Sequence, residues 1–472
     1  MKNNKVLLYL MALIAIILCV PSIIYLINNK TVDGFSAYYT YTLQPWNNML
    51  EGLMSGIIIV GLLTLFTVLY IWIIKKEQEF VKNTKNILIF IAIISFVFML
   101  ILPYLSSDIY YYMGDSWVLA KYGENPYYTS VGNLQETGIN DEILDNTGYW
   151  KNTTSVYGPL WNIFSSILVS LSFGKVTIAL FIFKIASYLI HVLNSYLIYK
   201  ITKSTKYMLL YGLNPLVLIE FLSNVHNDIY LVFFILLALY FLVKKKNIYL
   251  TMLALALSVS VKYSTALLVP FILIYCFRDK TLPKRILYCL ISGLSIVGVV
   301  VLLYLPFFRD ITIFTNMLVQ GTKYSQSILA LLMNTNIFKY IDFWKIPFFL
   351  ILYIATLAIL LFKKKVTLIN ILRKYNLMML LFIFIVLTNF QKWYILWIFP
   401  TIMWQSKNMR NFIIFLTITA IIPSLQYLVI GTDAYLVGRI YSLEMLIISG
   451  FLLLDNIFEQ KFKFKKEKKC QI

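Results

Sequence analysis

Long apolar runs separated by short lysine-rich stretches are the feature that most limits the folds open to this chain. Hydrophobic residues make up 60% of the 472 positions and charged residues only 13%, which is far from the composition of a soluble globular domain. An α-helix of roughly 20 apolar residues crosses the hydrocarbon core of a bilayer, and many of the runs approach this length. We therefore predict an all-α, polytopic integral membrane protein whose first partner is the lipid bilayer.

The distribution of positive charge indicates a topology rather than a ligand. A net charge of +20 is compatible with a nucleic-acid partner, but the lysines are grouped in short loops, such as the triplets at 244–246 and 363–365. Such grouping is typical of the cytoplasmic loops of membrane proteins. Placing these loops in the cytoplasm predicts about 14 transmembrane helices, two cytoplasmic termini and no nucleic-acid partner.

This topology divides a single transmembrane domain, 1–472, into recognisable parts. Two spans lie within 1–85, before the first large loop. The loop that begins at 106 carries seven acidic residues and two lysines up to Ser155, as an external segment should. Pro159 suits the first turn of a helix that lies at the outer interface. We predict a large outer loop with juxtamembrane helices at 106–174 and a second outer loop at 307–345.

Several site classes are absent from the sequence. The four cysteines show no pairing pattern, and no histidine, cysteine or carboxylate group has metal-ligand spacing. We therefore assign no metal ligand and no cofactor, while the need for a divalent metal and the oligomeric state stay open. No nucleotide-binding motif is present. An enzyme of this kind would receive its activated substrate through the membrane.

The stretch "SSDIYYYMGDSWVLAKYGENPY", 106–127, places a carboxylate where an apolar run ends. If 108–122 is helical, Asp108, Tyr112 and Asp115 share one face, with Asp115 about 10 Å further along the axis. This separation favours one general base rather than an acid and base pair. The simpler alternative is that Asp108 only caps the helix. Tyr110 and Tyr111 are interpreted as interfacial packing.

Other polar and aromatic residues collect at the predicted outer ends of the spans. Aromatic rings stack on sugars, and cations bind phosphate. Structural alternatives are equally simple: interfacial anchoring for the aromatic residues, Lys392 and Arg439, a solvated turn for the HND sequence at 226–228, and a snorkelling side chain for Lys262. His191 lies within a span and is interpreted as a packing residue. The candidates for substrate binding, besides Tyr112 and Asp115, are Asn125, Tyr127, Tyr157, His226, Asn227, Asp228, Lys262, Lys323, Gln326, Lys392, Trp393, Tyr394 and Arg439.

These motifs resemble those of a known group of proteins. "SDIYYY", "GENPY", "YGPLW", "SNVHNDIYLVFF" and "QKWYILW" are similar to sequences of the GT-C membrane glycosyltransferases, particularly the bacterial polyprenyl-phosphate mannosyltransferases related to alpha-(1,6)-mannopyranosyltransferases. The resemblance implies inverting transfer of a hexose, mannose first among the candidates. The donor would be a polyprenyl-phosphate sugar, and the acceptor a cell-envelope glycan or glycolipid at the outer face.

The resemblance also implies roles for single residues. Asp108 matches the catalytic carboxylate and would act as general base on the acceptor hydroxyl. The cations that receive the departing phosphate would come from Lys262, Lys323, Lys392 or Arg439. The chain departs from the usual pattern in one respect: in most of the group the aspartate follows the first span, whereas here two spans precede the one that leads to Asp108.

Two other functions stay open. A transporter or flippase of lipid-linked sugars would use the same aromatic rings and cations without a base. A glycan polymerase of related fold would use a pyrophosphate-linked donor. The high content of lysine, isoleucine and asparagine is typical of an AT-rich bacterial genome. We therefore predict a multi-pass protein of the bacterial plasma membrane with its active site facing outside.

Overall fold

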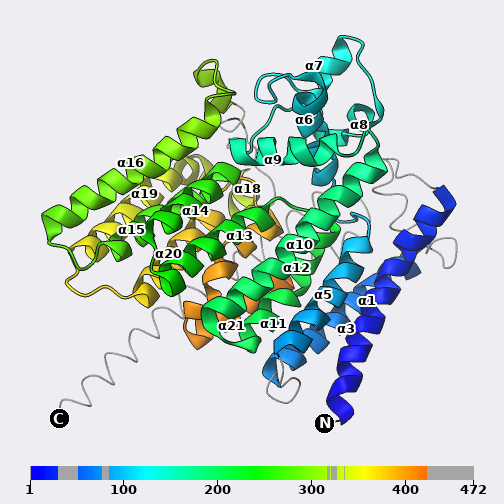
Figure 1. Cartoon of the computed structure of the whole chain (residues 1–472), viewed down its shortest axis with the longest axis horizontal. Helices are drawn as coiled ribbons and strands as arrows, with labels where there is room; N and C mark the ends of the chain where they lie inside the picture. Colours follow the sequence, from blue (N-terminus) through cyan, green and yellow to red (C-terminus); the bar gives the residue numbers. More distant parts are fainter. Residues whose placement is uncertain are drawn as a thin grey trace.

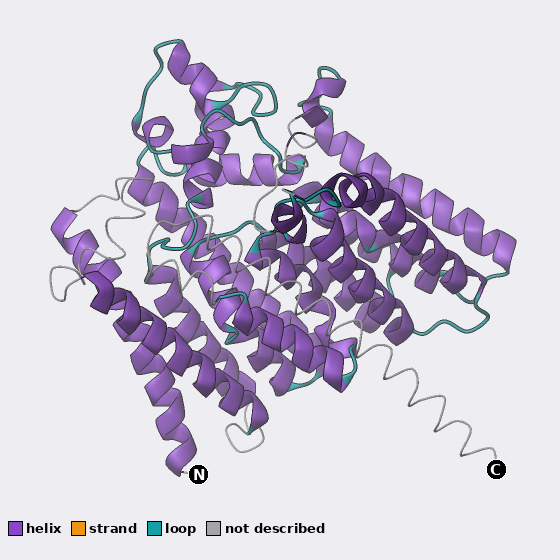
Figure 2. Ribbon diagram, turned by 180° about the vertical axis from the view of Figure 1, so that it is seen from behind, coloured by secondary structure: helices purple, strands orange, loops and turns teal. Residues whose placement is uncertain are grey.

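The computed structural model describes residues 2–29, 52–76, 84–315, 319, 327–333 and 335–421. Within these ranges the chain is helical and has no strand (Figures 1 and 2), which confirms the predicted all-α class. Three candidate site residues, Lys323, Gln326 and Arg439, lie outside the described residues. The predicted last span, 439–456, and the end of the span before it, after residue 421, also lie outside the described residues.

The N-terminal helices form one side of a helical bundle. The first of them, α1 (Lys2–Asn29), packs against both α3 (Gly52–Lys75) and α5 (Thr84–Leu100). In turn, α5 packs against α10 (Val176–Thr202), and α3 contacts Thr205–Gly212 and Pro215–Leu218, so the first two predicted spans join the rest of the protein through α3 as well as α5 (Figure 1).

The rest of the bundle continues from α10 in a series of helix pairs. This helix packs on α13 (Asp228–Tyr240), α13 on α14 (Ile248–Val261), and α14 on α16 (Leu282–Tyr304). One continuous buried apolar core runs through the bundle. The other helices of the described part are α11 (Thr205–Gly212), α15 (Val269–Cys276), α18 (Ile328–Leu332), α19 (Phe338–Phe362), α20 (Leu368–Leu381), α21 (Lys407–Thr419), η3 (Phe241–Lys245), η4 (Tyr263–Leu267), η5 (Ile311–Phe314), η6 (Phe382–Val386) and η7 (Lys392–Trp404).

The described part of the chain does not supply all the membrane-crossing helices that were predicted. In the described part of the chain six helices are long and apolar enough, or seven if one bent pair counts as a span. The prediction of about 14 spans is therefore not confirmed. It counted apolar runs such as Thr84–Leu100 and Ile248–Val261, which fold as helices shorter than a full span.

The bent pair replaces two spans predicted at 207–222 and 228–243. Its first arm contains α12 (Pro215–Leu218) and the π-helical η2 (Ile219–Ser223), and its second arm is α13 with η3. The helix direction bends by 118° between the two arms, across the turn at 224–227. Within this turn Val225 has φ of +60°, which is costly for a β-branched residue and typical of functional sites.

Residues 106–174, named the cap here, lie together at one end of the bundle (Figure 1). The cap contains α6 (Asp108–Tyr122), α7 (Val131–Glu136), α8 (Glu142–Asp145), η1 (Gly148–Trp150) and α9 (Pro159–Ser170). The predicted helix 108–122 is confirmed, and so is Pro159 in the first turn of the next long helix. The end of α1 that begins at Lys2 lies at the opposite end of the bundle. Which end faces the cytoplasm stays a prediction.

Candidate active site

A buried lysine joins the bent pair to the segment that precedes the cap. Lys184, on α10, is fully buried and donates to the carbonyl oxygens of Ile101 at 2.7 Å, Leu222 at 3.1 Å and Ser223 at 2.8 Å. The three carbonyl groups lie at the C-terminal ends of α5 and η2, and the last carbonyl groups of a helix have no partner within it. The side chain of Asn224 also accepts from backbone N–H groups of the segment that leads to α6. The start of the cap is thereby fixed beside the turn at 224–227.

The first residue of α6 is Asp108. Ser107 occupies the N-cap position, so capping is not the role of Asp108. The Ser106 hydroxyl accepts from the Asp108 backbone N–H at 3.3 Å. The Asp108 side chain keeps 22% of its surface exposed, and it borders a large cavity. A carboxylate in this position is open to a ligand.

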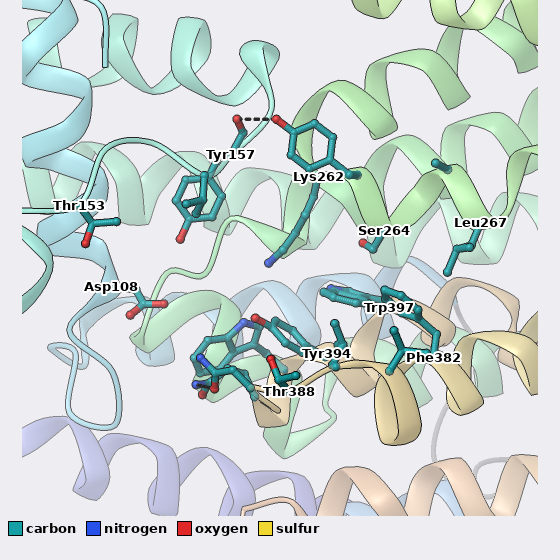
Figure 3. Close-up of a pocket in the computed structure, with 18 of the residues that line it drawn as sticks. Asp108, Thr153, Tyr157, Lys262, Ser264, Leu267, Phe382, Thr388, Tyr394 and Trp397 are labelled. Atoms are coloured by element: carbon teal, nitrogen blue, oxygen red, sulfur yellow. Dashed lines mark hydrogen bonds between the residues drawn. The ribbon is translucent and has the colours of Figure 1, made fainter. Parts of the chain in front are cut away.

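This cavity has a volume of about 590 Å³ and is shared by the cap and the bundle. Asp108 and Thr153 lie at one end of it, while Leu267 and Phe382 lie at the other (Figure 3). One end is therefore polar and the other apolar, as a ligand with a polar head and a lipid tail requires. Six predicted site residues line it, namely Asp108, Tyr112, Tyr157, Lys262, Trp393 and Tyr394.

Lys262 is the cation between the two ends of the cavity. Its ammonium group donates to the buried Asp228 carboxylate at 2.8 Å. The same nitrogen lies 5.0 Å from the ring centre of Tyr394 and 5.3 Å from that of Trp397. The Trp397 indole also donates to Asp228. Lys262 is thus held by a carboxylate and aromatic faces, both of which stabilise its charge.

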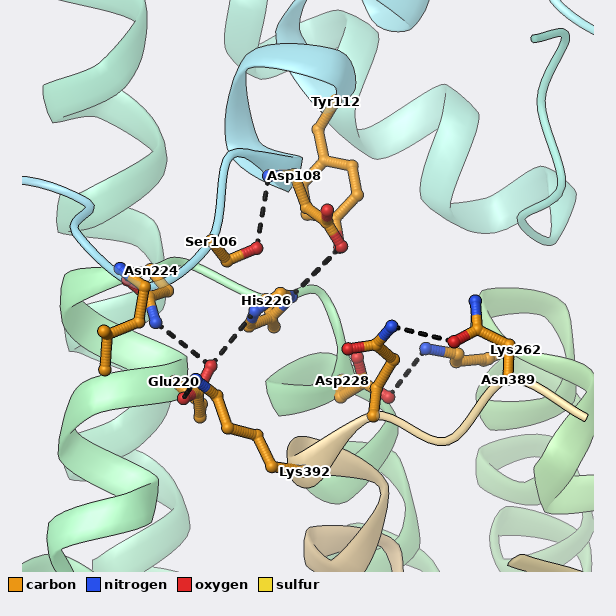
Figure 4. A network of polar contacts seen from close by, with 12 residues as sticks. Ser106, Asp108, Tyr112, Glu220, Asn224, His226, Asp228, Lys262, Asn389 and Lys392 are labelled. Carbon is orange, nitrogen blue, oxygen red and sulfur yellow. Dashed lines mark hydrogen bonds and ion pairs between the residues drawn. The ribbon is translucent and has the colours of Figure 1, made fainter. Parts of the chain in front are cut away.

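The HND sequence is a buried turn and not a solvated one. His226, Asn227 and Asp228 are all 0% exposed. His226 lies behind Asp108, with its Nδ1 3.6 Å from a carboxylate oxygen of Asp108 and 3.4 Å from the Tyr112 hydroxyl. Its other ring nitrogen, Nε2, lies 3.1 Å from the carboxylate of Glu220 (Figure 4).

Lys392 lies beside Glu220, behind the residues that line the cavity, and is not part of the cavity wall. It is 5% exposed and forms an ion pair with Glu220 at 3.1 Å. Its neighbour Trp393 lines the cavity and stacks on His226, with the ring centres 3.5 Å apart. The predicted phosphate contact of Lys392 therefore has a competing partner, whereas Lys262 faces the cavity.

Three further candidates lie away from the cavity wall. The side chain of Asn125 donates to the Phe307 carbonyl, and the Tyr127 hydroxyl donates to the Tyr157 carbonyl. Asp115 is 4% exposed, and burial raises its pKa to about 8, so its carboxyl group is mainly protonated at neutral pH. These residues position the cap.

Tyr110 and Tyr111 differ from the prediction of interfacial packing. Both are buried, at 0% and 4% exposure. Tyr111 lines the cavity, and its hydroxyl donates to the Thr153 carbonyl. The helix that carries them is covered by α9 on one side and by the rest of the cap on another, so its rings have no access to a lipid interface.

Sequence reasoning missed Glu220 and Trp397. Glu220 is a single acid within the apolar run "PLVLIEFLS", and a charge inside an apolar helix is by itself a reason to expect a functional site. Trp397 lies at the end of "QKWYILW". No periodicity connects Glu220 to Lys392, 172 positions later, so their pairing could not be predicted.

Gly158 allows the cap to lie directly on the end of α14. A Cβ atom added here would lie 2.0 Å from the carbonyl oxygen of Ser260, and the Gly158 N–H donates to the Val261 carbonyl. We expect Gly158→Ala to lower the free energy of unfolding by about 1–3 kcal/mol, because the backbones must separate. It should also reduce turnover, because Tyr157 and Lys262 would move apart.

Thermal unfolding of the detergent-solubilised protein measures this effect. Gly298→Ala, on α16, is the matched control, since nothing lies within 4 Å of its added Cβ. That variant should be as stable as the parent or slightly more so. Equal unfolding temperatures for the two variants would contradict the close approach at Gly158.

The described residues contain no group of three or more histidine, cysteine, aspartate or glutamate side chains that could hold a metal ion.

Comparison with known proteins gives one match. A family model described as "alpha-(1->6)-mannopyranosyltransferase, N-terminal domain" matches residues 7–278, more than half of the chain. The matched part includes α1 and α3 as well as Asp108, Glu220 and Lys262. No curated protein and no solved structure matches the chain.

Proposed function

Because the chain belongs to the alpha-(1->6)-mannopyranosyltransferase family, a group of GT-C type enzymes, we propose that it transfers mannose from a polyprenyl-phosphate donor. The acceptor would be a cell-envelope glycan or glycolipid at the outer face of the bacterial plasma membrane. The observation that carries this proposal is the cavity, in which Asp108 lies at a polar end and Leu267 and Phe382 form an apolar end.

The two ends of the cavity suit the two parts of such a donor. The apolar end favours the first isoprene units, since burial of apolar surface stabilises binding by roughly 25 cal/mol per Å². Lys262, between the ends, favours the phosphate. The sugar would then lie toward Asp108, among the rings of Tyr157 and Tyr394.

A single displacement completes the reaction in this arrangement. The acceptor hydroxyl attacks the anomeric carbon and gives its proton to the Asp108 carboxylate, while the bond from that carbon to the phosphate oxygen breaks. Lys262 stabilises the charge that develops on the departing phosphate. One displacement inverts the anomeric configuration, so donor and product should differ in it.

The test uses purified protein in lipid nanodiscs with polyprenyl-phosphate mannose and a glycolipid fraction from bacterial membranes. We expect a mannosylated product of inverted configuration and release of polyprenyl monophosphate. Turnover only with a pyrophosphate-linked donor would favour a polymerase. Movement of the lipid-linked sugar between leaflets without any product would favour a transporter.

The acidic side of the pH–rate profile should report the Asp108 carboxyl group. Burial raises the pKa of Asp108 above its ordinary range, although His226 and Lys262 act in the opposite direction. The ionised form is the base, so turnover should be lost as the pH falls through this raised pKa. Initial rates between pH 4 and pH 9 measure it; an acidic limb at the ordinary aspartate value, about 3.9, would contradict the assignment.

A further inference from the structure

A second layer of charged residues lies behind Asp108, out of reach of any ligand in the cavity. His226 and Glu220 are 0% exposed, and neither lines the cavity. Glu220 comes from the first arm of the bent pair and His226 from its turn, and Lys184 fixes that arm to Ile101, just before the start of the cap. These residues therefore act on a substrate only through the cavity-lining side chains that His226 contacts, and Asp108 is the carboxylate among them.

We propose that Glu220 and His226 are positioning residues that keep Asp108 ionised and oriented, with His226 held as an imidazolium between the two carboxylates. This inference rests on the proposed role of Asp108 as the base. It assigns a function to a buried pair whose residues do not contact the substrate.

The positions of the two ring nitrogens support this assignment. Nε2 lies 3.1 Å from the Glu220 carboxylate, and Nδ1 lies 3.6 Å from the Asp108 carboxylate. A neutral imidazole has one N–H and one lone pair, so its lone pair would face one of the two carboxylates. A doubly protonated ring is a cation and attracts both carboxylates across these two ion-pair distances. The Tyr112 hydroxyl, 3.4 Å from Nδ1, is compatible with either form because it can accept or donate.

The balance of charge points in the same direction. Ion-pair contacts of the described residues connect Asp108 and Glu220 to His226, Glu220 to Lys392, and Asp228 to Lys262. Three carboxylates thus face two ammonium groups, which leaves one negative charge in a largely buried cluster. Unbalanced buried charge is costly, and a proton on His226 balances it. The indole of Trp393, stacked on the imidazole, further favours a cation.

Direct observation of His226 is feasible because the chain contains only two histidines. Protein labelled with ¹⁵N-histidine and purified through a tag without histidine should give two sets of ring signals in nanodiscs. At neutral pH we expect one ring with both nitrogens protonated and one neutral ring. His191→Gln identifies the signals, since the loss of the neutral ring assigns the imidazolium to His226.

His191 is a suitable reference because it is equally buried but has no carboxylate partner among the described residues. Its Nε2 contacts the Gly212 carbonyl at 3.1 Å, and its Nδ1 has no hydrogen-bond partner there. A neutral ring at His226 throughout the pH range of activity would overturn the proposal. This measurement needs no variant of the cluster, so it does not depend on whether such variants fold.

Kinetics of His226→Gln test the effect on Asp108. The groups that act on the Asp108 carboxylate are His226, Lys262, Asp228 and the Ser106 hydroxyl, and only the first is changed. Loss of the imidazolium should move the acidic limb of the pH–rate profile upward by about one pH unit or more. We expect a lower turnover number at neutral pH and an unchanged KM for the donor.

A purely structural role for His226 would lower activity without moving that limb, and this outcome would overturn the proposal. His191→Gln should leave the limb where it is. The two proposals fail separately. If Asp108→Asn stays active, the assignment of the base fails whatever the charge of His226, whereas a neutral His226 with an inactive Asp108→Asn overturns only the role of the buried pair.

Discussion

Asp108→Asn should lower mannosyl transfer by about 10²- to 10⁴-fold, which is the usual contribution of a general base. The amide has the same shape as the carboxylate but cannot accept the proton of the acceptor hydroxyl. Asp108 borders the cavity with 22% of its side chain exposed, so the substitution should leave the fold intact. Initial rates with polyprenyl-phosphate mannose, together with size-exclusion profiles in detergent, measure both effects.

Asp115→Asn is the matched comparison, because the two carboxyl groups belong to the same face of α6. Asp115 is buried away from the cavity, and its raised pKa of about 8 means that an amide replaces a carboxyl group that is already mainly neutral at pH 7. We expect this variant to transfer mannose at close to the parent rate. An active Asp108→Asn beside an inactive Asp115→Asn would reverse the assignment of the base.

Lys262→Met should lower the turnover number by about 10²- to 10³-fold, the range seen when one group that stabilises transition-state charge is removed. Two effects are combined in this variant. The departing phosphate loses its cation, and the fully buried Asp228 carboxylate loses its ion pair. The second effect alone should also destabilise the protein, since an unpaired buried charge is costly.

The double variant Lys262→Met/Asp228→Asn separates these effects. It removes both charges, so the unfolding temperature should return toward that of the parent. Turnover should stay low, because the Lys262 ammonium group beside the phosphate is still missing. Recovery of turnover together with stability would mean that Lys262 only neutralises Asp228.

Local features of the site were predictable from the sequence. A run of residues with helical spacing after an apolar segment predicted α6 with its observed limits and placed Asp108 and Tyr112 on one face. Lys262, within an apolar run, was among the predicted binding residues, and in the structure it lines the cavity and has a carboxylate partner. These conclusions depended on a few neighbouring residues, where spacing and burial are informative.

Long-range features were not predictable in the same way. Hydropathy gives the same signal for a span and for a shorter helix covered by protein, so the run that forms Thr84–Leu100 was predicted as a span. The break after Ser223 depends on Lys184 and Asn224, which satisfy carbonyl and N–H groups of distant segments. A single sequence contains no signal for such contacts. The same limitation hid the pairing of Glu220 with Lys392.

The three carbonyl contacts of Lys184 have a consequence for how the protein assembles. Ile101 precedes Lys184 in the chain, while Leu222 and Ser223 follow it. During synthesis Ile101 is made before α10 and the bent pair. Its carbonyl group would therefore gain its Lys184 partner only after α10 has been made. Asp108 and His226 would become neighbours only after all three segments are in the membrane. The site would therefore be completed only late in the assembly of the protein.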